Sequence, residues 1–298
     1  MTVVLPTYNR AGPIGRAIAS VLEQSYTNLE VIVVDDASSD STAEVVGAFT
    51  DPRLRYLRHR ENKGGAAARN TGIEAAGGEL IAFQDSDDAW LPEKLAKQVP
   101  LFQRREVGVV YTGLWVLKDG DKTYFPANTV AKREGDIHSE LLKGSFIGTP
   151  TLCVRKECFK KAGAFDERLP RLQDWELLIR LSKHYTFGLV DEPLVLAYLG
   201  KDNISANSKA LLAAQTMILE KHYDDFMGAG QGVLGKHLYE VGHLLCLQGK
   251  ASLGREYIGR ALKHSARPKY LAGFLLSLLG SGAYKTSARL RARALGKR

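Results

Sequence analysis

The sequence predicts an α/β protein, with a doubly wound, mostly parallel, Rossmann-like sheet followed by an α-helical extension. Three observations predict this fold. Short apolar runs alternate with helix-period patterns, two acidic clusters each follow such a run directly, and strand patterns cease near residue 205. The 298 residues are enough for one large domain and a smaller one.

The first elements can be assigned in order from their hydrophobic periods. Val3 to Leu5 is a short strand, and Ile14 to Leu22 repeats apolar residues at helical spacing. Val31 to Val34 is apolar on both faces, as buried parallel strands are. Asp40 is expected to cap a helix that carries apolar residues as far as Phe49. The later elements are strands at Leu54 to Leu57, Leu80 to Phe83 and Val107 to Leu117, and helices at Ala66 to Ala76 and after Pro92.

Composition indicates a globular protein of a reducing compartment. Hydrophobic residues make up 45% and charged residues 25% of the chain, which is typical of a packed core. The three cysteines, Cys153, Cys158 and Cys246, form no metal-type pair and are too few for a disulfide framework. We see no signal peptide, and the apolar run Leu271 to Leu279 is about half a membrane span. We therefore expect a cytoplasmic protein.

Beyond about residue 205 the patterns are helical. Apolar faces recur in Ala210 to Tyr223, Leu234 to Leu247 and Leu253 to Lys263. Within the last two segments the spacing is similar to that of one tetratricopeptide repeat. A single repeat is not stable alone, so we expect a helical hairpin packed on the larger domain. A role in binding a partner is the alternative.

The net charge of +8 is concentrated near the C-terminus, where eight basic residues and no acidic one follow from Arg267 onward. The apolar segment Tyr270 to Leu279 precedes the basic segment Ser287 to Arg298. This order favours contact with an anionic membrane surface, as in a peripheral protein of the inner membrane face. A disordered, solvated tail is nearly as good an interpretation. Nucleic-acid binding is disfavoured, because no aromatic platform accompanies the basic residues.

Asp85 to Asp88 form the first candidate site, directly after the fourth strand. Crowded carboxylates repel one another unless a cation binds. Oxygen ligands suit Mg²⁺ or Mn²⁺, and a site with few protein ligands leaves room for substrate phosphates. For an isolated cluster a solvated turn would be the better interpretation, but the position after an apolar strand favours a metal site.

Other candidate residues follow the first two strands. In the segment Pro6 to Arg10, Tyr8 could stack on a base, and Thr7 or Asn9 could form hydrogen bonds, although the segment also resembles an ordinary turn. Asp36 could accept the imide hydrogen of a uracil ring or could cap a helix.

Two further segments carry groups suited to phosphate binding and proton transfer. The loop Lys63 to Gly65, with Arg69, could approach a phosphate or could be a flexible surface loop. Asp174 precedes an aromatic residue and is a plausible general base. On spacing alone, a helix start with Asp174 as cap and Trp175 in the core is the better interpretation.

Taken together, these segments resemble the family 2 glycosyltransferases of GT-A fold, over roughly residues 1 to 200. Among them, the sequence looks most like the non-processive enzymes of bacterial surface polysaccharides. Each motif is weak, but their order and spacing make a strong joint signal. The matching segments are Val4 to Arg10, Val33 to Thr42, Asn62 to Gly64, Ala68 to Asn70, Asp85 to Asp88, Gly163 to Asp166 and Gln173 to Glu176.

The resemblance implies an inverting, metal-dependent transfer of a sugar from a nucleotide-sugar, with UDP favoured, to a hydroxyl of a glycan or lipid-linked acceptor. It implies a catalytic domain at 1–205, with a nucleotide-sugar half to about 115 and an acceptor half beyond, and a helical extension at 206–298. Asp174 would be the base, with Glu176 a weaker alternative. Pro6, Thr7, Tyr8, Asn9, Asp36, Lys63, Arg69, Asp85 and Ser86 would hold the nucleotide-sugar, and Asp87 or Asp88 the Mg²⁺ or Mn²⁺.

The sequence departs from the family pattern at three points. Little chain precedes the first strand, Gln173 stands where glutamate is common, and Tyr198 to Lys201 lacks the usual arginine and histidine. A QxxRW motif is also absent, which argues against a processive enzyme. The alternative function is a catalytically silent nucleotide-sugar-binding partner subunit. A nucleotidyltransferase or a dehydrogenase would need a glycine-rich loop after the first strand, which is missing.

Overall fold

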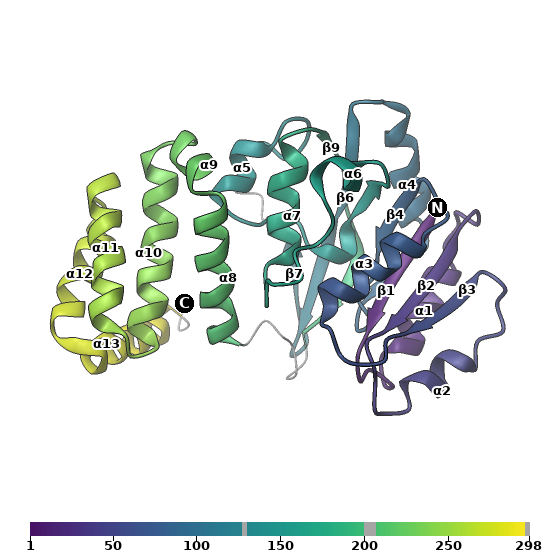
Figure 1. The fold of residues 1–298 in the computed structure, drawn as a ribbon, viewed down its shortest axis with the longest axis horizontal. Coiled ribbons are helices and arrows are strands. Elements are labelled where there is room, and N and C mark those ends of the chain that lie inside the picture. The colour runs from purple at the N-terminus through teal and green to yellow at the C-terminus, as the bar shows by residue number, and fades with distance from the viewer. Residues whose placement is uncertain (127–129, 200–206, 296–298) are drawn as a thin grey trace. The chain divides into compact units, whose positions relative to one another are not determined.

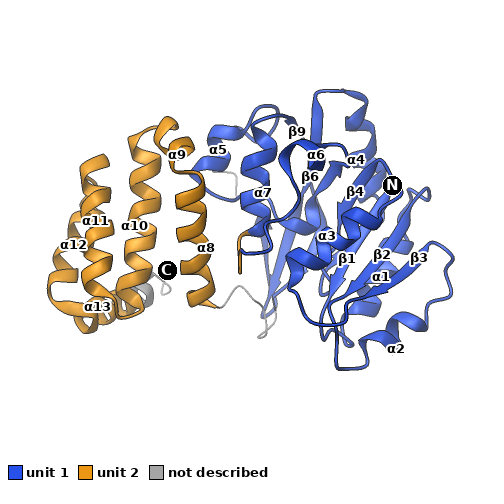
Figure 2. Cartoon of the chain, viewed as in Figure 1, with its two compact units in different colours: residues 1–168, 173–203 blue, residues 169–172, 204–298 orange. Residues whose placement is uncertain are grey.

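A computed structural model describes residues 1–126, 130–199 and 207–295, with side chains as far as residue 290 (Figure 1). The chain forms two compact units (Figure 2). The first contains residues 1–168 and 173–203, and the second contains residues 169–172 and 204–298. Gly200 and Lys201, which belong to the third departure noted above, and Lys297 and Arg298 lie outside the described residues.

Four parallel strands form one half of the sheet in the first unit. β1 (Thr2–Thr7) lies between β2 (Glu30–Asp35) and β4 (Leu80–Phe83), and β3 (Leu54–Arg58) pairs with the outer edge of β2. The predicted strands and their parallel arrangement are confirmed. Since the side chains of β1 and nearly all of those of β2 are buried on both faces, the sheet is covered by helices on both sides.

The other half of the sheet mixes directions. β6 (Val107–Lys118) and β9 (Thr186–Tyr198) form a long parallel ladder, and β8 (Cys153–Arg155) joins β6 to β4 in antiparallel pairing. With only three residues, β8 is too short for a sequence period to predict. β5 (Ala89–Trp90) and β7 (Asp121–Phe125) are short antiparallel partners of β9 and β6.

The predicted helices are present, with differences at their ends. α2 ends at Gly47, before Phe49, and after Pro92 a turn precedes α4. Ser41, and not Asp40 as predicted, is the N-cap residue of α2, and Asp40 precedes it and accepts a hydrogen bond from the Thr42 backbone N–H at 3.0 Å. The helices of this unit are α1 (Ile14–Leu22), α2 (Thr42–Gly47), α3 (Gly65–Ala75), α4 (Lys94–Gln98), α5 (His138–Lys143), α6 (Cys158–Ala162) and α7 (Gln173–Ser182), with 3-10 turns at Val99–Gln103 and Thr149–Thr151.

From Asn207 to Leu295 the second unit consists of helices joined by short turns, and the Asn207 side chain caps the first of them. Helices continue to Leu295, where a disordered tail was one expectation. Among the described residues, no helix is both long and apolar enough to cross a bilayer. Its helices are α8 (Ser208–Lys221), α9 (Tyr223–Gly228), α10 (Gln231–Leu247), α11 (Ala251–His264), α12 (Pro268–Leu278) and α13 (Gly280–Leu295).

Helices α10 and α11 form the predicted hairpin and approach closely at two glycines. A Cβ on Gly242 would lie 2.7 Å from the Gly254 carbonyl oxygen, and a Cβ on Gly254 would lie 2.4 Å from Cys246 Sγ. Neither distance is sterically allowed, so the two backbones can touch only because these residues lack side chains.

We expect Gly242→Ala to lower the free energy of unfolding by about 1–3 kcal/mol, because the added methyl group forces α10 and α11 apart. Gly282→Ala on α13 is the matched control. Its Cβ would meet nothing within 4 Å, so alanine should stabilise that helix by about 0.5–1 kcal/mol. Urea denaturation followed by circular dichroism measures both. Equal effects of the two variants would contradict the close packing.

Candidate active site

The candidate segment Pro6 to Arg10, expected to follow the first strand, begins within β1. Pro6 and Thr7 belong to β1 and are buried, whereas Tyr8 is 45% exposed and leads into the loop. Proline fits at this place because β4 pairs with β1 only from Thr2 to Val4. The ring of Tyr8 is therefore the part of this segment most open to a ligand.

The loops after β1 and β2 are tied together by side chains. Asn9 has a positive φ of 51°, and its N–H donates to Ser38 Oγ at 2.9 Å. Its side-chain oxygen accepts from the Ser39 N–H at 2.8 Å, and Asp40 accepts from the Ala11 N–H at 3.0 Å. Asn9 thus orients the loop in which Tyr8 lies, a structural role that the sequence pattern did not separate from ligand binding.

Asp36 is buried and already has three hydrogen-bond donors. Its Oδ1 accepts from the Lys63 N–H at 2.9 Å and faces His59 Nδ1 at 2.8 Å, and its Oδ2 accepts from the Gly64 N–H at 2.7 Å. A carboxylate has about four lone pairs, so Oδ2 keeps one acceptor position. Asp36 therefore fixes the loop before α3. The side chain of Lys63 itself is exposed.

Arg69 connects two segments that are far apart in the sequence. Its Nη2 donates to Asp85 Oδ1 at 2.7 Å, and its Nη1 donates to Gln173 Oε1 at 3.3 Å. The guanidinium group lies 5.6 Å from the centre of the Phe165 ring. The bridge brings the loop after β4 to the first residue of α7, which places Asp85 near Asp174.

Asp174 is held by two hydrogen bonds at the start of α7. Its Oδ2 accepts from Thr149 Oγ1 at 3.0 Å, and its Oδ1 accepts from the Trp175 N–H at 2.8 Å. Burial raises its pKa above the ordinary value of 3.8, although both hydrogen bonds and the charge of Arg69 act in the opposite direction. A carboxylate with a raised pKa in a fixed position is suited to accept a proton.

Glu176 has a different environment from Asp174. It is fully buried, and its Oε2 accepts a hydrogen bond from Arg180 Nη2 at 2.8 Å. Arg180 also donates to the carbonyl oxygens of Ala162 and Ala164. This buried ion pair fixes the loop after α6 and leaves Glu176 inaccessible to a substrate. The weaker candidate base is thereby a structural residue. Trp175 lies in the core, as expected.

The carboxylates of Asp87 and Asp88 point to different surroundings. Asp88 is 7% exposed, and its Oδ1 accepts from the Tyr198 N–H at 3.1 Å. Burial, with the charges of Asp85 and Asp87, raises its pKa to about 8. Asp87 also has a raised pKa, from burial and from Asp85, and its Oδ2 lies 3.8 Å from Arg10 Nε. Ser86, between them and Asp85, is buried.

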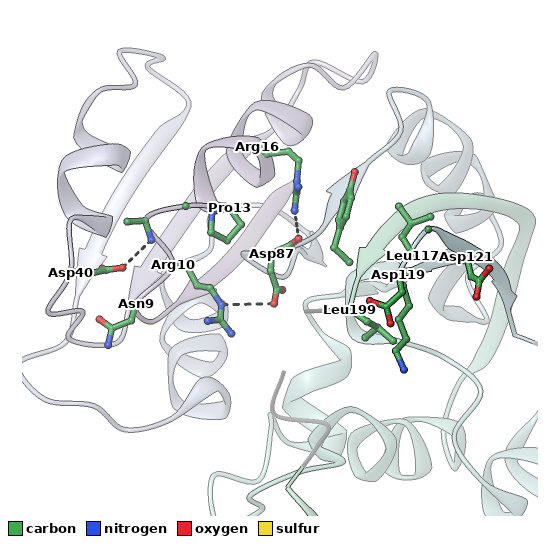
Figure 3. A pocket seen from close by; sticks show the side chains of 15 residues that line it. Asn9, Arg10, Pro13, Arg16, Asp40, Asp87, Leu117, Asp119, Asp121 and Leu199 are labelled. Atoms are coloured by element: carbon green, nitrogen blue, oxygen red, sulfur yellow. Dashed lines mark hydrogen bonds and ion pairs between the residues drawn. The ribbon is translucent and has the colours of Figure 1, made fainter. Parts of the chain in front are cut away.

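A cavity of about 720 Å³ opens beside Asp87 (Figure 3). Arg10 and Arg16 lie on either side of Asp87, and Arg16 donates to its backbone carbonyl oxygen. The Arg16 guanidinium group also lies 3.7 Å from the centre of the Tyr198 ring, which lines the same cavity. The volume is typical of small-molecule sites. The turn between β6 and β7, at residues 117–121, forms another part of its lining.

The acidic residues fit a cation held partly by substrate. Among the described residues, no group of three or more His, Cys, Asp or Glu side chains could hold a metal ion by itself. Burial and the charge of Asp85 nevertheless raise the pKa of Asp87, and a divalent cation would offset the repulsion between these two carboxylates. Mg²⁺ is commonly bound by one or two carboxylates together with substrate phosphates. The donor set therefore suits such an ion.

Buried polar groups without protein partners occur close to these residues in the sequence. Within the described parts of the chain, Thr7 Oγ1, Arg69 Nε and the side-chain amide of Gln84 have none. Buried polar atoms normally form hydrogen bonds, so a water molecule or a ligand is needed to supply the missing partners of these three groups. Thr7 and Arg69 are among the predicted nucleotide-sugar residues. Gln84 was not predicted, because it directly follows a strand and no motif marks it as a ligand-binding residue.

The sequence did not indicate several residues of this arrangement. Arg16 follows the motif by six positions on α1, and Thr149 lies in a 3-10 turn without any motif. Gln173 was noted only as a departure, yet it receives the Arg69 hydrogen bond. Only the folded chain brings these side chains to Asp87 and Asp174.

Comparison with known proteins identifies the class. The model of the glycosyl transferase family 2 matches residues 2–163. The chain belongs to this family and is a glycosyltransferase, and its α/β unit has the GT-A fold.

Two curated bacterial proteins are similar in sequence. The chain is 29% identical over 221 residues to UDP-Glc:alpha-D-GlcNAc-diphosphoundecaprenol beta-1,3-glucosyltransferase WfgD of Escherichia coli, which covers 74% of this chain and 85% of that protein. It is 34% identical over 206 residues to the amylovoran biosynthesis glycosyltransferase AmsB of Erwinia amylovora, which covers 65% and 67%.

Two solved structures are similar in fold. The S. aureus TarS fragment in complex with UDP-GlcNAc has a TM-score of 0.67 at 18% identity, covering 98% of this chain and 91% of that one. The mannosyltransferase PcManGT from Pyrobaculum calidifontis, in complex with GDP-Man and Mn²⁺, has a TM-score of 0.61 at 20% identity, covering 97% and 86%.

Proposed function

We propose that this glycosyltransferase inverts configuration while it moves a sugar from a UDP-sugar to a hydroxyl of a lipid-linked glycan, with Mg²⁺ or Mn²⁺ as cofactor. The observation that carries the proposal is the Arg69 bridge, which brings Asp85 and the helix start at Asp174 together. The names of WfgD and AmsB support a role in polysaccharide synthesis. A lipid-linked acceptor would bring the enzyme to the cytoplasmic face of the inner membrane.

On this proposal, the chain's own residues hold the donor in a fixed position. Tyr8 stacks on the base, while Thr7, Asp36 and the loop at Lys63 surround the nucleoside. Arg69 and Asp85 meet the ribose and diphosphate, and Asp87 is the carboxylate that holds the cation. When bound, the cation neutralises the charge that develops on the leaving diphosphate.

Asp174 acts on the acceptor. Its carboxylate takes the proton of the acceptor hydroxyl while that oxygen forms a bond to the anomeric carbon of the sugar. The bond from the anomeric carbon to the phosphate oxygen breaks on the opposite face, so the configuration is inverted and the nucleoside diphosphate leaves. Thr149 holds the carboxylate in place, which keeps the base aligned.

The test is donor hydrolysis by the purified protein with Mn²⁺ and a panel of UDP-, GDP- and dTDP-sugars. We expect release of one nucleoside diphosphate that chelation with EDTA abolishes. Calorimetry with the same nucleotides measures binding separately from turnover. Binding without turnover, with or without a glycan acceptor, would favour the catalytically silent partner subunit. Absence of both would refute the proposal.

The raised pKa of Asp174 leads to a pH prediction. A base must be ionised, so kcat/KM should fall as the pH drops through the raised pKa, at a higher pH than the ordinary value of 3.8 would give. In Thr149→Val the hydrogen bond that favours the ionised form is lost, so this acid limb should move to still higher pH. The plateau at high pH should change little. An unchanged limb in Thr149→Val would contradict the assignment of Asp174.

A further inference from the structure

Helix α12 carries a row of leucines on its solvent side. Leu271, Leu275 and Leu278 of the helix, and Leu279 directly after it, are between 52% and 73% exposed. Their spacing of three, four and seven or eight residues places them on one face of the helix. Single exposed leucines are common on protein surfaces, but a contiguous row marks an interaction site. We call these four residues the leucine face.

The opposite side of α12 fixes the helix in this orientation. Tyr270, Gly273 and Ser277 are buried, and the Tyr270 ring stacks on Tyr239 of α10 with centroids 4.5 Å apart. A Cβ on Gly273 would lie 3.0 Å from the Tyr239 ring, so the two helices are in close contact there. Turning α12 to bury the leucines would lose this packing. The leucine face is therefore exposed because the other side is the one that fits α10.

The chain around the leucine face is strongly basic. From Tyr257 to Arg298 the sequence contains ten lysines and arginines and no aspartate or glutamate. Arg267 and Lys269 precede the leucines and are exposed, and Arg289 on α13 is exposed beside Leu290, which is itself 60% exposed. An exposed apolar row within a stretch of sequence of one charge sign is typical of helices that lie in the surface of an anionic bilayer.

We propose that the leucine face of α12 is a membrane-binding surface, which enters the headgroup region of an anionic phospholipid bilayer while the surrounding lysines and arginines contact lipid phosphates. A second copy of this chain fits the leucine face less well than a membrane does. A two-fold contact through this face would bring the same basic residues of two copies together, and between Tyr257 and Arg298 the chain has no acidic residue to pair with them. Binding at this surface would bring the enzyme to the proposed lipid-linked acceptor and in that respect rests on the proposed function. The surface itself can be tested without any substrate.

The experiment is co-sedimentation of the full chain with vesicles of phosphatidylcholine, with and without phosphatidylglycerol. We expect binding only to the anionic vesicles, and weaker binding at higher salt. The double variant Leu275→Gln with Leu278→Gln should bind about tenfold more weakly. Arg289→Gln should bind about fivefold more weakly. Leu253→Gln on α11 is the matched control, because Leu253 is 43% exposed but lies outside the leucine face, and its binding should not change.

A fluorescent label can identify the contact directly. The native cysteines Cys153, Cys158 and Cys246 are buried, so an introduced Leu275→Cys can be labelled selectively with a polarity-sensitive dye. Anionic vesicles should shift its emission to the blue, and the same dye on Leu253→Cys should not respond. Equal vesicle binding by wild type and the double leucine variant would overturn the proposal. So would a dimer in solution that only the leucine variants lose, since a second copy would then cover this face.

Membrane binding and catalysis can be separated. Donor hydrolysis in solution should be unchanged in the leucine variants, because these residues belong to the helical unit and not to the candidate active site. Loss of vesicle binding with retained hydrolysis supports the surface proposal. Vesicle binding by a protein that shows no turnover would leave the surface in place and refute only the proposed activity.

Discussion

Asp174→Asn should lower kcat by about 10²–10⁴-fold, which is the usual contribution of a general base. The amide can still accept from the Trp175 N–H and can donate to Thr149 Oγ1, so the fold and the donor affinity should be retained. The measurement is glycosyl transfer to an acceptor, together with calorimetric titration of the nucleotide. Wild-type turnover in this variant would exclude Asp174 as the base.

Glu176→Gln is the matched control, since it makes the same carboxylate-to-amide change two residues along α7. The carboxylate of Glu176 pairs with Arg180 in the protein interior. Breaking such a pair leaves a buried charge without its partner and should cost about 3 kcal/mol of folding free energy. We therefore expect a lower melting temperature with turnover largely kept. A large loss of turnover without a change in stability would instead make Glu176 the base.

Asp87→Asn should reduce kcat/KM by about 10²–10³-fold and remove the response to Mn²⁺, because an amide binds divalent cations more weakly than a carboxylate does. Asp88→Asn is the comparison. The side-chain oxygen of an asparagine at 88 can still accept from the Tyr198 N–H, so a structural role would be preserved. Titration of Mn²⁺ against turnover measures both variants. The reverse order of effects would assign the cation to Asp88.

These two predictions depend on geometry that the motif pattern left open. In the sequence Asp87 and Asp88 are adjacent and equivalent, and Asp174 and Glu176 are both acidic residues of one motif. In the folded chain Asp88 turns to the backbone of β9, and Asp87 lines a cavity. The difference arises from neighbours that come from distant parts of the chain, so no local pattern could contain it.

Local signals were sufficient for the elements that fold by their own pattern. The apolar runs of β1, β2 and β4, and the helical period of α1, predicted the parallel half of the sheet and placed Asp36 and Asp85 at the carboxyl ends of its strands, the edge where such sheets commonly bind ligands. The three-residue β8 was not predicted, because its pairing with β4 and β6 depends on both neighbours being in place. Its strand character is imposed by the sheet and is not a property of Cys153 to Arg155 alone.

The sequence alone determined the class of protein, because the motifs of the family keep their order along the chain and lie at strand and helix ends that hydrophobic periods can locate. Only the tertiary structure decided which side chains act together. Arg69 meets Asp85 and Gln173, Thr149 holds Asp174, and the leucine face of α12 is exposed because its other side fits α10. Each of these outcomes depends on packing between residues far apart in sequence, which sets distances and burial that composition and spacing do not encode.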